Sequence, residues 1–322
     1  MLYPSHAGEF LELGLAGIAM SRYSGCWTGM KVIADTIETT GVIDLAGEQR
    51  QFVEPTDFDM PEDGLNIRWP DDRWTQDQRL QEQKGYAALA WARANKLDRV
   101  VMDTKRPRIG IIASGKSYED VRQALRELEI DDITADRLGL RLYKVAMPWP
   151  LEPYGVREFA EGLETILVVE ERREIIENQI KQQLYNWTPN KRPKVIGKFD
   201  IEDKPLLPLG KELTTGIIAR AICDLVMKVQ MDSGLKEQLQ RKLDWFARRA
   251  EMRKKHVAAT ERLPYFCSGC PHNSSTKLPD GSRALGGIGC HFMVLWMDRS
   301  TETFSHMAVS YTHLTLPTTP YV

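Results

Sequence analysis

Three of the chain's five cysteines lie in one stretch, residues 264–291, which reads PYFCSGCPHNSSTKLPDGSRALGGIGCH. Cys267 and Cys270 form a C-x-x-C pair, and Cys290 follows on a glycine-rich turn. Two thiolates at this spacing can bind one metal, and a third can complete most of a tetrahedral site. The pattern predicts zinc or an iron–sulfur cluster. A redox pair or unliganded thiols are the alternatives, and a structural disulfide is the weaker account because nothing in the sequence indicates secretion.

The residues around these cysteines resemble one enzyme family. FCSGCPHN, GSRALGGIGCH and MDRSTETF follow one another as in indolepyruvate ferredoxin oxidoreductases, specifically the long fused bacterial form. The similarity also covers SRYSGCW, GLNIRWPD, SGKSYEDVRQAL, LYKVAMPWPLEP and ILVVEERREIIENQIKQQLYNW. It therefore runs from near the start of the chain to about residue 307. Several motifs in one order are far harder to meet by chance than a single C-x-x-C.

This resemblance implies an activity and a set of cofactors. The family belongs to the thiamine diphosphate-dependent 2-oxoacid:ferredoxin oxidoreductases, which would convert an arylpyruvate such as indolepyruvate to an aryl-acetyl-CoA. The implied cofactors are thiamine diphosphate, Mg²⁺ and a [4Fe-4S] cluster, and cysteine-ligated clusters suit one-electron transfer. The implied partners are ferredoxin, CoA and the 2-oxoacid. A homo-oligomer is expected for the full-length protein.

The resemblance also assigns residues to these cofactors. Its cluster ligands match Cys267, Cys270 and Cys290, and its diphosphate-approaching loop matches Ile288, Gly289, Cys290 and His291. Glycines at 287 and 289 would let backbone N–H groups approach the diphosphate. His272 is a candidate for a contact near the cofactor, with a structural role as the equal alternative. No catalytic residue is assigned.

Two parts of the family pattern are missing from this sequence. The Gly-Asp-Gly and Asn motif that holds Mg²⁺ and the diphosphate in thiamine enzymes does not occur. The part that would carry the glutamate activating the thiazolium is absent too, and the fourth family cysteine would lie beyond residue 307. We therefore expect a central piece of a longer enzyme that binds a cluster poorly and turns over nothing alone. Its three cysteine sulfurs should still point towards one locus, near the turn at 286–289.

Short apolar runs alternate with helical patterns in the middle of the chain. The runs lie at residues 109–113, 142–147, 166–169 and 195–197, and the helical patterns at 118–128, 155–163 and 175–185. This alternation predicts an α/β fold with a parallel sheet covered on both faces by helices. The resemblance identifies it as a transketolase C-terminal-like domain, with partial thiamine diphosphate-binding domains on either side.

Helical periodicity also predicts elements outside the sheet. The patterns cover residues 8–20, 30–41 with Gly41 as C-cap, 75–96, and two helices within 214–256. In the third pattern Leu80, Tyr86, Leu89, Ala90 and Trp91 are expected to be available to a core. We expect the chain to begin with the end of a pyrimidine-type thiamine-binding domain at 1–46, followed by a connecting segment and helix at 47–104. The α/β domain is expected at 105–204 and a helical linker at 205–262. The start of a diphosphate-type domain is expected at 263–307, and a non-native tail at 308–322.

Three smaller features have alternative interpretations. The turn at residues 114–117 follows a strand and opens a helix, so capping is favoured over an anion contact such as a CoA phosphate. The charge run at 170–173 is expected to face water rather than to form an acid/base pair. Cys26 is expected to pack as a small apolar residue.

Composition excludes several classes of function. The 322 residues are 42% hydrophobic and 27% charged, with a net charge of -2, and Lys and Arg are spread among Asp and Glu. This gives no electrostatic footprint for nucleic acid. No signal peptide and no apolar run of membrane-spanning length occurs, so we expect no membrane partner and a cytoplasmic location.

Two other classes of protein compete with the oxidoreductase. The first is a zinc-binding structural or interaction protein, with Cys267, Cys270, Cys290 and either His272 or His291 in a closed Cys3His site. A colourless protein with stoichiometric zinc would favour it, whereas a brown protein would favour the cluster. The second is a transketolase-like acyl transferase, which leaves the three cysteines unexplained.

Residues 308–322 read AVSYTHLTLPTTPYV and resemble one frame of a transposase sequencing adapter, which predicts a non-native tail. The alternative is a genuine, disordered threonine-rich terminus. Neither gives the segment a core, so deleting residues 309–322 should leave the thermal midpoint unchanged in a calorimetric scan. A measurable drop would show that the tail belongs to the fold.

Overall fold

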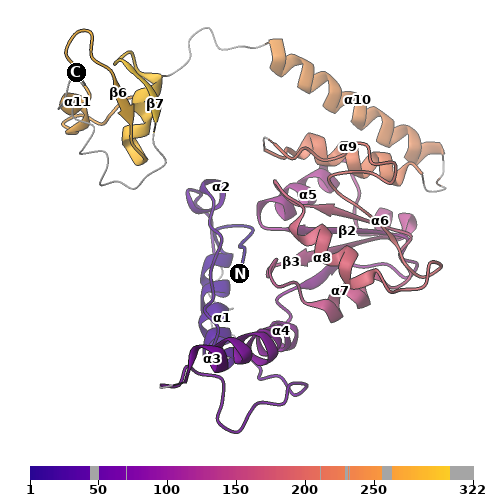
Figure 1. Ribbon diagram of the computed structural model, residues 1–322. Helices are drawn as coiled ribbons and strands as arrows, with labels where there is room; N and C mark the ends of the chain where they lie inside the picture. The colour runs from indigo at the N-terminus through magenta and orange to yellow at the C-terminus, as the bar shows by residue number, and fades with distance from the viewer. Residues whose placement is uncertain are drawn as a thin grey trace. The chain divides into compact units, whose positions relative to one another are not determined.

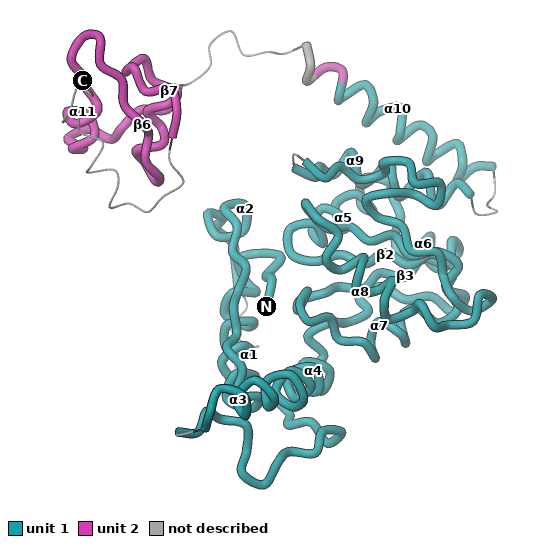
Figure 2. The backbone as a smooth tube through the Cα atoms, in the orientation of Figure 1, with its two compact units in different colours: residues 1–250 teal, residues 251–322 magenta. Residues whose placement is uncertain are grey.

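The chain is described from a computed structural model over residues 1–43, 51–69, 71–210, 212–228, 231, 233–255 and 263–304. It divides into two compact units, residues 1–250 and 251–322 (Figure 2). Within the residues described, no helix is long and apolar enough to cross a membrane. The predicted tail and the adapter-like peptide lie outside the described residues.

A five-stranded sheet forms the centre of the first unit. Its strands are β1 Arg99–Met102, β2 Ile109–Ser114, β3 Leu140–Val145, β4 Thr165–Val169 and β5 Lys194–Ile196, in the order β1-β3-β2-β4-β5. The four predicted strands pair with one another only in parallel, which confirms the α/β prediction. Strand β1 was not predicted, although Val100, Val101 and Met102 are apolar. It pairs antiparallel with β3 at the edge of the sheet, and its residues are largely exposed.

Helices cover both faces of this sheet, as predicted (Figure 1). They are α5 Lys116–Glu127, α6 Asp132–Leu138, α7 Pro153–Ala160 and α8 Ile175–Leu184. Neighbouring residues of a strand point to opposite faces. Ile111 accordingly packs in the cluster with α5 and α6, and Ile112 packs in the cluster with α7 and α8. Helix α6 was not predicted.

Helix α9 Thr215–Val226 extends the first of these cores. Ile218 and Ile222 belong to the same buried cluster as Val121 and Leu125 of α5. The charged helix α10 Ser233–Lys255 follows and adds Leu239 to that cluster. The two helices predicted within 214–256 are therefore present, although part of the segment interpreted as a linker contributes to the α/β core.

Helix α1 Glu9–Ser24, predicted from residues 8–20, packs against the long helical region of residues 73–94. That region consists of α3 Arg73–Arg79, the π-helix η2 Leu80–Lys84 and α4 Gly85–Ala94. Trp91 is buried against Leu13, but Leu80 and Tyr86 are exposed, contrary to the prediction. The π-helical turn inserts an extra residue, which shifts Leu80 away from the apolar face of α4. Tyr86 lies in α4 itself, on its exposed side.

The helix predicted at residues 30–41 is also wrong for most of its length. Only α2 Ala34–Ile37 is helical. Met30 forms a parallel bridge with Leu2, and the N–H of Lys31 donates to the Leu2 carbonyl at 2.8 Å. Val32 and Ile33 are β-branched and suit this extended backbone better than a helix.

The carboxylate of Asp98 joins the loop after α4 to the end of β3. Its Oδ1 accepts the N–H groups of Ala146 at 2.7 Å and Met147 at 2.9 Å. Its Oδ2 is buried and has no hydrogen-bond partner among the described residues. Burial raises the pKa of Asp98 to about 7, outweighing the two donated hydrogen bonds.

Asp98→Asn should remove a pH dependence of stability. Because the folded pKa lies above the unfolded value, the wild-type carboxyl contributes most stability below pH about 4 and loses that contribution as pH rises through about 7. The variant keeps the acceptor oxygen, so its free energy of unfolding should exceed that of the wild type by about 1–3 kcal/mol at pH 8 and by less at pH 5. Urea unfolding of both proteins at the two pH values tests this; equal differences would contradict it.

Candidate functional site

The second unit carries the cysteine motif on short elements. These are α11 His272–Ser275, β6 Ala284–Gly286, the 3-10 helix η3 Gly289–Trp296 and β7 Thr301–Phe304, with β6 and β7 parallel. Few of its side chains are fully buried. Its geometry therefore depends on individual hydrogen bonds and ring contacts.

The C-x-x-C segment forms a closed turn. The N–H of Cys270 donates to the Cys267 carbonyl at 3.0 Å, and the side-chain amide of Asn273 donates to the same carbonyl at 2.9 Å. Gly269 has φ +75°, a conformation that glycine adopts without strain. Arg299 holds the next turn by donating to the Asn273 carbonyl at 3.0 Å. The turn thus fixes the backbone from which both thiols project.

The glycine-rich turn is fixed by one histidine. Nδ1 of His291 accepts the N–H of Gly287 at 2.6 Å. Gly289 has φ +63° at the start of η3. Burial lowers the pKa of His291, and the nearby His272 lowers it further, which favours the neutral ring that an accepting Nδ1 requires.

Two histidines bring the predicted site segments together. The rings of His272 and His291 are 5.4 Å apart between centroids in an edge-to-face arrangement, and the Phe266 ring centroid lies 5.2 Å from that of His272. His272 follows Cys270 by two residues, and His291 follows Cys290 directly. The C-x-x-C turn and the glycine-rich turn are therefore neighbours, although they are distant in sequence.

The three predicted ligands do not meet at one point. Among the described residues, no three His, Cys, Asp or Glu side chains are grouped so that they could hold a metal ion. Cys267 and Cys290 are exposed and Cys270 is half-buried. The expectation that the three sulfurs share a locus is thus wrong for this structure. Ligand-bearing segments commonly close only when the metal binds, because bare thiolates gain nothing from being gathered.

The donor chemistry nevertheless fits a cluster. All five cysteines are free thiols rather than disulfides. Soft thiolates on two adjacent turns are the ligands that iron–sulfur clusters use. Cys223 is fully buried, and burial raises the pKa of its thiol to about 12, so it behaves as a core residue. Cys26 is half-buried, in partial agreement with the packing expected for it.

The structure tests the interpretations of two charged segments, residues 114–117 and 170–173. Lys116 pairs with Asp120 and Glu212, both at 2.9 Å, so its charge is already neutralised and an anion contact at 114–117 is not supported. The prediction that residue 170 faces water is wrong. Glu170 is buried and accepts the N–H groups of Ile175, Ile176 and Glu177, which caps α8.

Sequence reasoning missed the residues that position the site. Arg299 donates to Asn273 and Thr276 and lies over the Phe266 ring. Asn273 closes the C-x-x-C turn. Arg299 and Asn273 lie in MDRSTETF and FCSGCPHN, two segments that resemble the family. The sequence therefore marked these segments but did not indicate which groups the two side chains contact.

Comparison with known proteins gives this fold and site a family. Residues 98–206 match the family model of the indolepyruvate ferredoxin oxidoreductase middle domain. Indolepyruvate oxidoreductase subunit IorA of Thermococcus kodakarensis is 29% identical over 214 residues, 63% of this chain and 28% of the relative. The same subunit of Pyrococcus abyssi is 31% identical over 170 residues, 52% of this chain and 22% of the relative. The chain thus spans under a third of the length of these relatives.

Solved structures also align with the chain. A 2-oxoglutarate:ferredoxin oxidoreductase from Magnetococcus marinus with 2-oxoglutarate, coenzyme A and succinyl-CoA bound matches 53% of this chain and 26% of its own, with a TM-score of 0.34 and 16% identity. A split-gene transketolase in an inactive beta4 tetramer matches 50% of this chain and 55% of its own, with a TM-score of 0.28 and 13% identity.

The segment that contains the central sheet of the first unit is thus the part of the chain that matches a domain of an oxidoreductase family. More specifically, residues 98–206 are similar to the middle domain of indolepyruvate ferredoxin oxidoreductases, and the curated relatives are named indolepyruvate oxidoreductase subunits. The resemblance read from the sequence is confirmed. Neither the family match nor the described residues support the zinc-binding alternative.

His291→Phe should loosen the glycine-rich turn. Phenylalanine keeps an aromatic ring at position 291, but the buried N–H of Gly287 loses its acceptor. An unsatisfied buried N–H lowers stability by about 1–3 kcal/mol. Hydrogen exchange at the Gly287 amide should therefore accelerate in NMR measurements. His291→Asn is the matched control, because its Oδ1 can replace Nδ1 as acceptor and should largely retain the protection. Unchanged exchange in the phenylalanine variant would contradict the role of this hydrogen bond.

Proposed function

We propose that this chain is part of an enzyme that oxidatively decarboxylates arylpyruvates such as indolepyruvate to aryl-acetyl-CoA and passes the electrons to ferredoxin. The observation that carries the proposal is the family match over residues 98–206. The names of the curated relatives supply the substrate class. CoA as acyl acceptor, a homo-oligomeric full-length protein and a cytoplasmic location are parts of the same proposal.

Cys267, Cys270 and Cys290 are the proposed ligands of a [4Fe-4S] cluster. The C-x-x-C turn carries two of the thiols on one backbone, and the His272–His291 contact brings the glycine-rich turn that carries Cys290 next to it. Closing the two turns on a cluster requires movement of exposed segments rather than of a packed core. A cluster at this position would accept and release single electrons.

The turn at Ile288, Gly289, Cys290 and His291 is the proposed approach to the diphosphate of thiamine diphosphate. Positive φ at Gly289 turns the backbone where η3 begins, and no other atom lies within 4 Å of the place a Cβ would take. This open backbone suits close approach of an anion. Bound thiamine diphosphate, with Mg²⁺, would supply the electron sink that decarboxylation of a 2-oxoacid needs. No described residue is proposed as a Mg²⁺ ligand.

His272 is proposed to lie at the edge of this cofactor site. Its ring contacts both Phe266 and His291, with centroid distances of 5.2 and 5.4 Å, so neighbouring rings restrict its orientation. A ring held in this way can present a fixed nitrogen to the cofactor. The proposed organisation into a central α/β domain with parts of two thiamine-binding domains on either side follows from the same family assignment.

Anaerobic reconstitution with iron and sulfide tests the proposal. We expect a brown protein. A complete [4Fe-4S] cluster in every chain would give about four irons per chain, and we expect fewer on average because only three thiolate ligands are present. Cys267→Ser and Cys290→Ser should each lower the bound iron at least severalfold. Cys26→Ser, which changes a half-buried cysteine outside the motif, is the matched control and should load like the parent.

Two outcomes would contradict this assignment. A colourless protein with one zinc per chain would favour the structural site, and equal iron loading in Cys267→Ser would remove that residue from the ligand set. We expect the isolated chain not to reduce a viologen dye with an arylpyruvate. Reduction that is lost in Cys267→Ala would show that the chain already contains a complete active site.

A further inference from the structure

The C-x-x-C turn pairs Cys267 with Cys270 through its backbone. The N–H of Cys270 donates to the Cys267 carbonyl at 3.0 Å, so residues 267–270 close a β-turn. Gly269 has φ +75°, as the third residue of a type II turn requires. The side-chain amide of Asn273 donates to the same carbonyl at 2.9 Å. Two hydrogen bonds therefore hold the two cysteines at the ends of one closed turn.

This turn satisfies the backbone distance that a disulfide needs. The first and fourth Cα atoms of a β-turn lie less than about 7 Å apart. Cysteines joined by a disulfide have Cα atoms about 4.4–6.8 Å apart. Joining the two sulfurs thus requires rotation of side chains and leaves the turn closed. A metal site with three ligands requires more, because no three His, Cys, Asp or Glu side chains of the described residues are grouped for one.

The two thiols of the turn differ in exposure. Cys267 is exposed and Cys270 is half-buried. The thiol that attacks a disulfide in solution must be accessible, whereas the thiol that completes the exchange needs to reach only its neighbour. Exposed disulfides are also more easily reduced than structural ones. The turn therefore has the arrangement of a reversible redox pair.

We propose that Cys267 and Cys270 form a reversible disulfide when no metal or cluster binds them. The oxidant is a small-molecule disulfide such as oxidised glutathione. The Cys267 thiolate attacks one glutathione sulfur and releases the other glutathione as a thiolate. The Cys270 thiolate then attacks the Cys267 sulfur, which forms the Cys267–Cys270 bond and releases the second glutathione. Two protein thiols are oxidised, one oxidised glutathione is reduced to two thiols, and the two protons pass to them.

The consequence for the cluster site rests on the proposed function. The disulfide removes two of the three proposed ligands and leaves Cys290 alone. Cluster ligands must be free thiolates, so an oxidised chain would accept no cluster until a reductant restores them. A bound cluster would in turn shield the same two sulfurs from the oxidant. The pair would thus make cluster loading depend on the redox state of the surrounding thiols.

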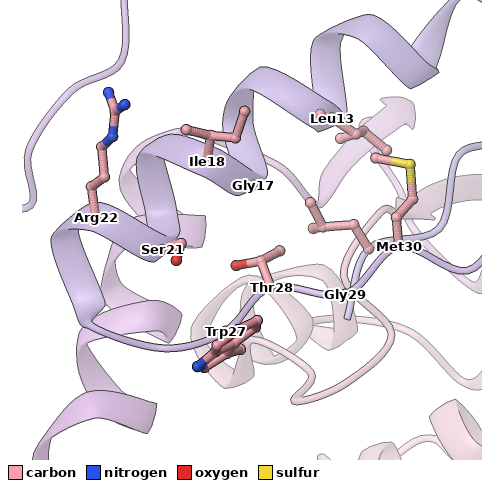
Figure 3. Close-up of a pocket in the computed structure, with 11 residues that line it drawn as sticks. Leu13, Gly17, Ile18, Ser21, Arg22, Trp27, Thr28, Gly29 and Met30 are labelled. Carbon is pink, nitrogen blue, oxygen red and sulfur yellow. The ribbon is translucent and has the colours of Figure 1, made fainter. Parts of the chain in front are cut away.

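Cys26 provides an internal comparison. It is half-buried, like Cys270, and directly precedes Trp27, which lines a pocket of about 460 Å³ beside α1 (Figure 3). No cysteine is among the residues that line this pocket. The nearest other cysteine in the sequence is Cys223, which is fully buried. We therefore expect no intramolecular disulfide from Cys26.

Alkylation and mass spectrometry test the proposal in the intact chain. The chain, prepared anaerobically without added iron, is equilibrated with mixtures of reduced and oxidised glutathione, alkylated with iodoacetamide and digested with trypsin. Trypsin leaves both cysteines of the pair in peptide 263–277, and it leaves Cys290 in 284–299 and Cys26 in 23–31. As the share of oxidised glutathione rises, peptide 263–277 should lose both labels and become two hydrogens lighter. Dithiothreitol should restore both labels.

Gly269→Val tests the role of the turn. Valine strongly disfavours positive φ, so the reduced variant should leave the closed turn. The equilibrium constant for disulfide formation against glutathione should then fall about tenfold. A Cβ at position 269 would meet nothing within 4 Å, so the effect comes from the backbone and not from a clash. Ser268→Val is the matched control, because residue 268 is exposed and has no positive φ, and it should oxidise like the parent.

Three results would overturn the proposal. One is a peptide 263–277 that keeps both labels or gains only glutathione adducts at every ratio. The second is a cross-link from Cys290 to either cysteine of the pair in place of the expected disulfide. The third is parent-like oxidation of Gly269→Val.

The redox measurement is independent of the proposed function. It needs no cluster, so a failed reconstitution leaves the disulfide result readable. Where reconstitution succeeds, the fraction of chains whose peptide 263–277 resists oxidation should equal the fraction loaded with a cluster. Oxidation of loaded chains at the rate of unloaded ones would contradict the shielding of the pair by the cluster.

Discussion

A buried ion pair joins helix α1 to strand β3 of the central sheet in the first unit. Lys144 lies near the C-terminal end of β3, and its ammonium contacts the carboxylate of Glu9 at the start of α1, 135 residues away in the sequence. The same ammonium donates to Ser5 Oγ at 3.1 Å and lies 4.7 Å from the Tyr118 ring centroid. Burial lowers the pKa of Lys144 to about 8, so desolvation of the charge is substantial. Removing one partner of such a pair leaves an uncompensated buried charge, which typically costs about 3–5 kcal/mol.

This pair has a consequence for the carboxyl end of the sheet. It fixes the first residues of the chain, so that Tyr3 donates its N–H to the Ala146 carbonyl at 2.8 Å just beyond β3. The Tyr3 ring then lies so close to Gly115 that a Cβ there would be 2.2 Å from it. The turn after β2, which sequence alone allowed to hold an anion, is thus covered by a ring and flanked by a neutralised Lys116. Its conformation serves packing between α1 and the sheet.

The central sheet could be predicted because its signal is local. Each buried strand is a short apolar run, and such runs between amphipathic helices leave few alternatives to a parallel sheet. Strand β1 escaped prediction although Val100, Val101 and Met102 favour a strand, because an antiparallel edge strand has no place in the alternation of strands and helices that predicted the rest. The π-helical turn at 80–84 escaped because its composition does not differ from that of an α-helix. Glu170 escaped for a different reason: its partners are backbone N–H groups of the next helix, which a charge pattern does not reveal. A buried carboxylate that caps a helix and a solvated one look alike in sequence.

The candidate site shows the same limit of prediction from sequence. Spacing identified Cys267, Cys270 and Cys290 as metal-binding residue types, but the positions of thiols depend on contacts that spacing does not encode. Those contacts are made by His291 with Gly287, by His272 with His291, and by Asn273 with the carbonyl of Cys267. They hold the two turns side by side, while Cys267 and Cys290 stay exposed and Cys270 is half-buried. Under the proposed function, only these turns would have to move to enclose a cluster. The order that the protein provides therefore lies in the backbone of the two turns, and a bound cluster would supply the rest.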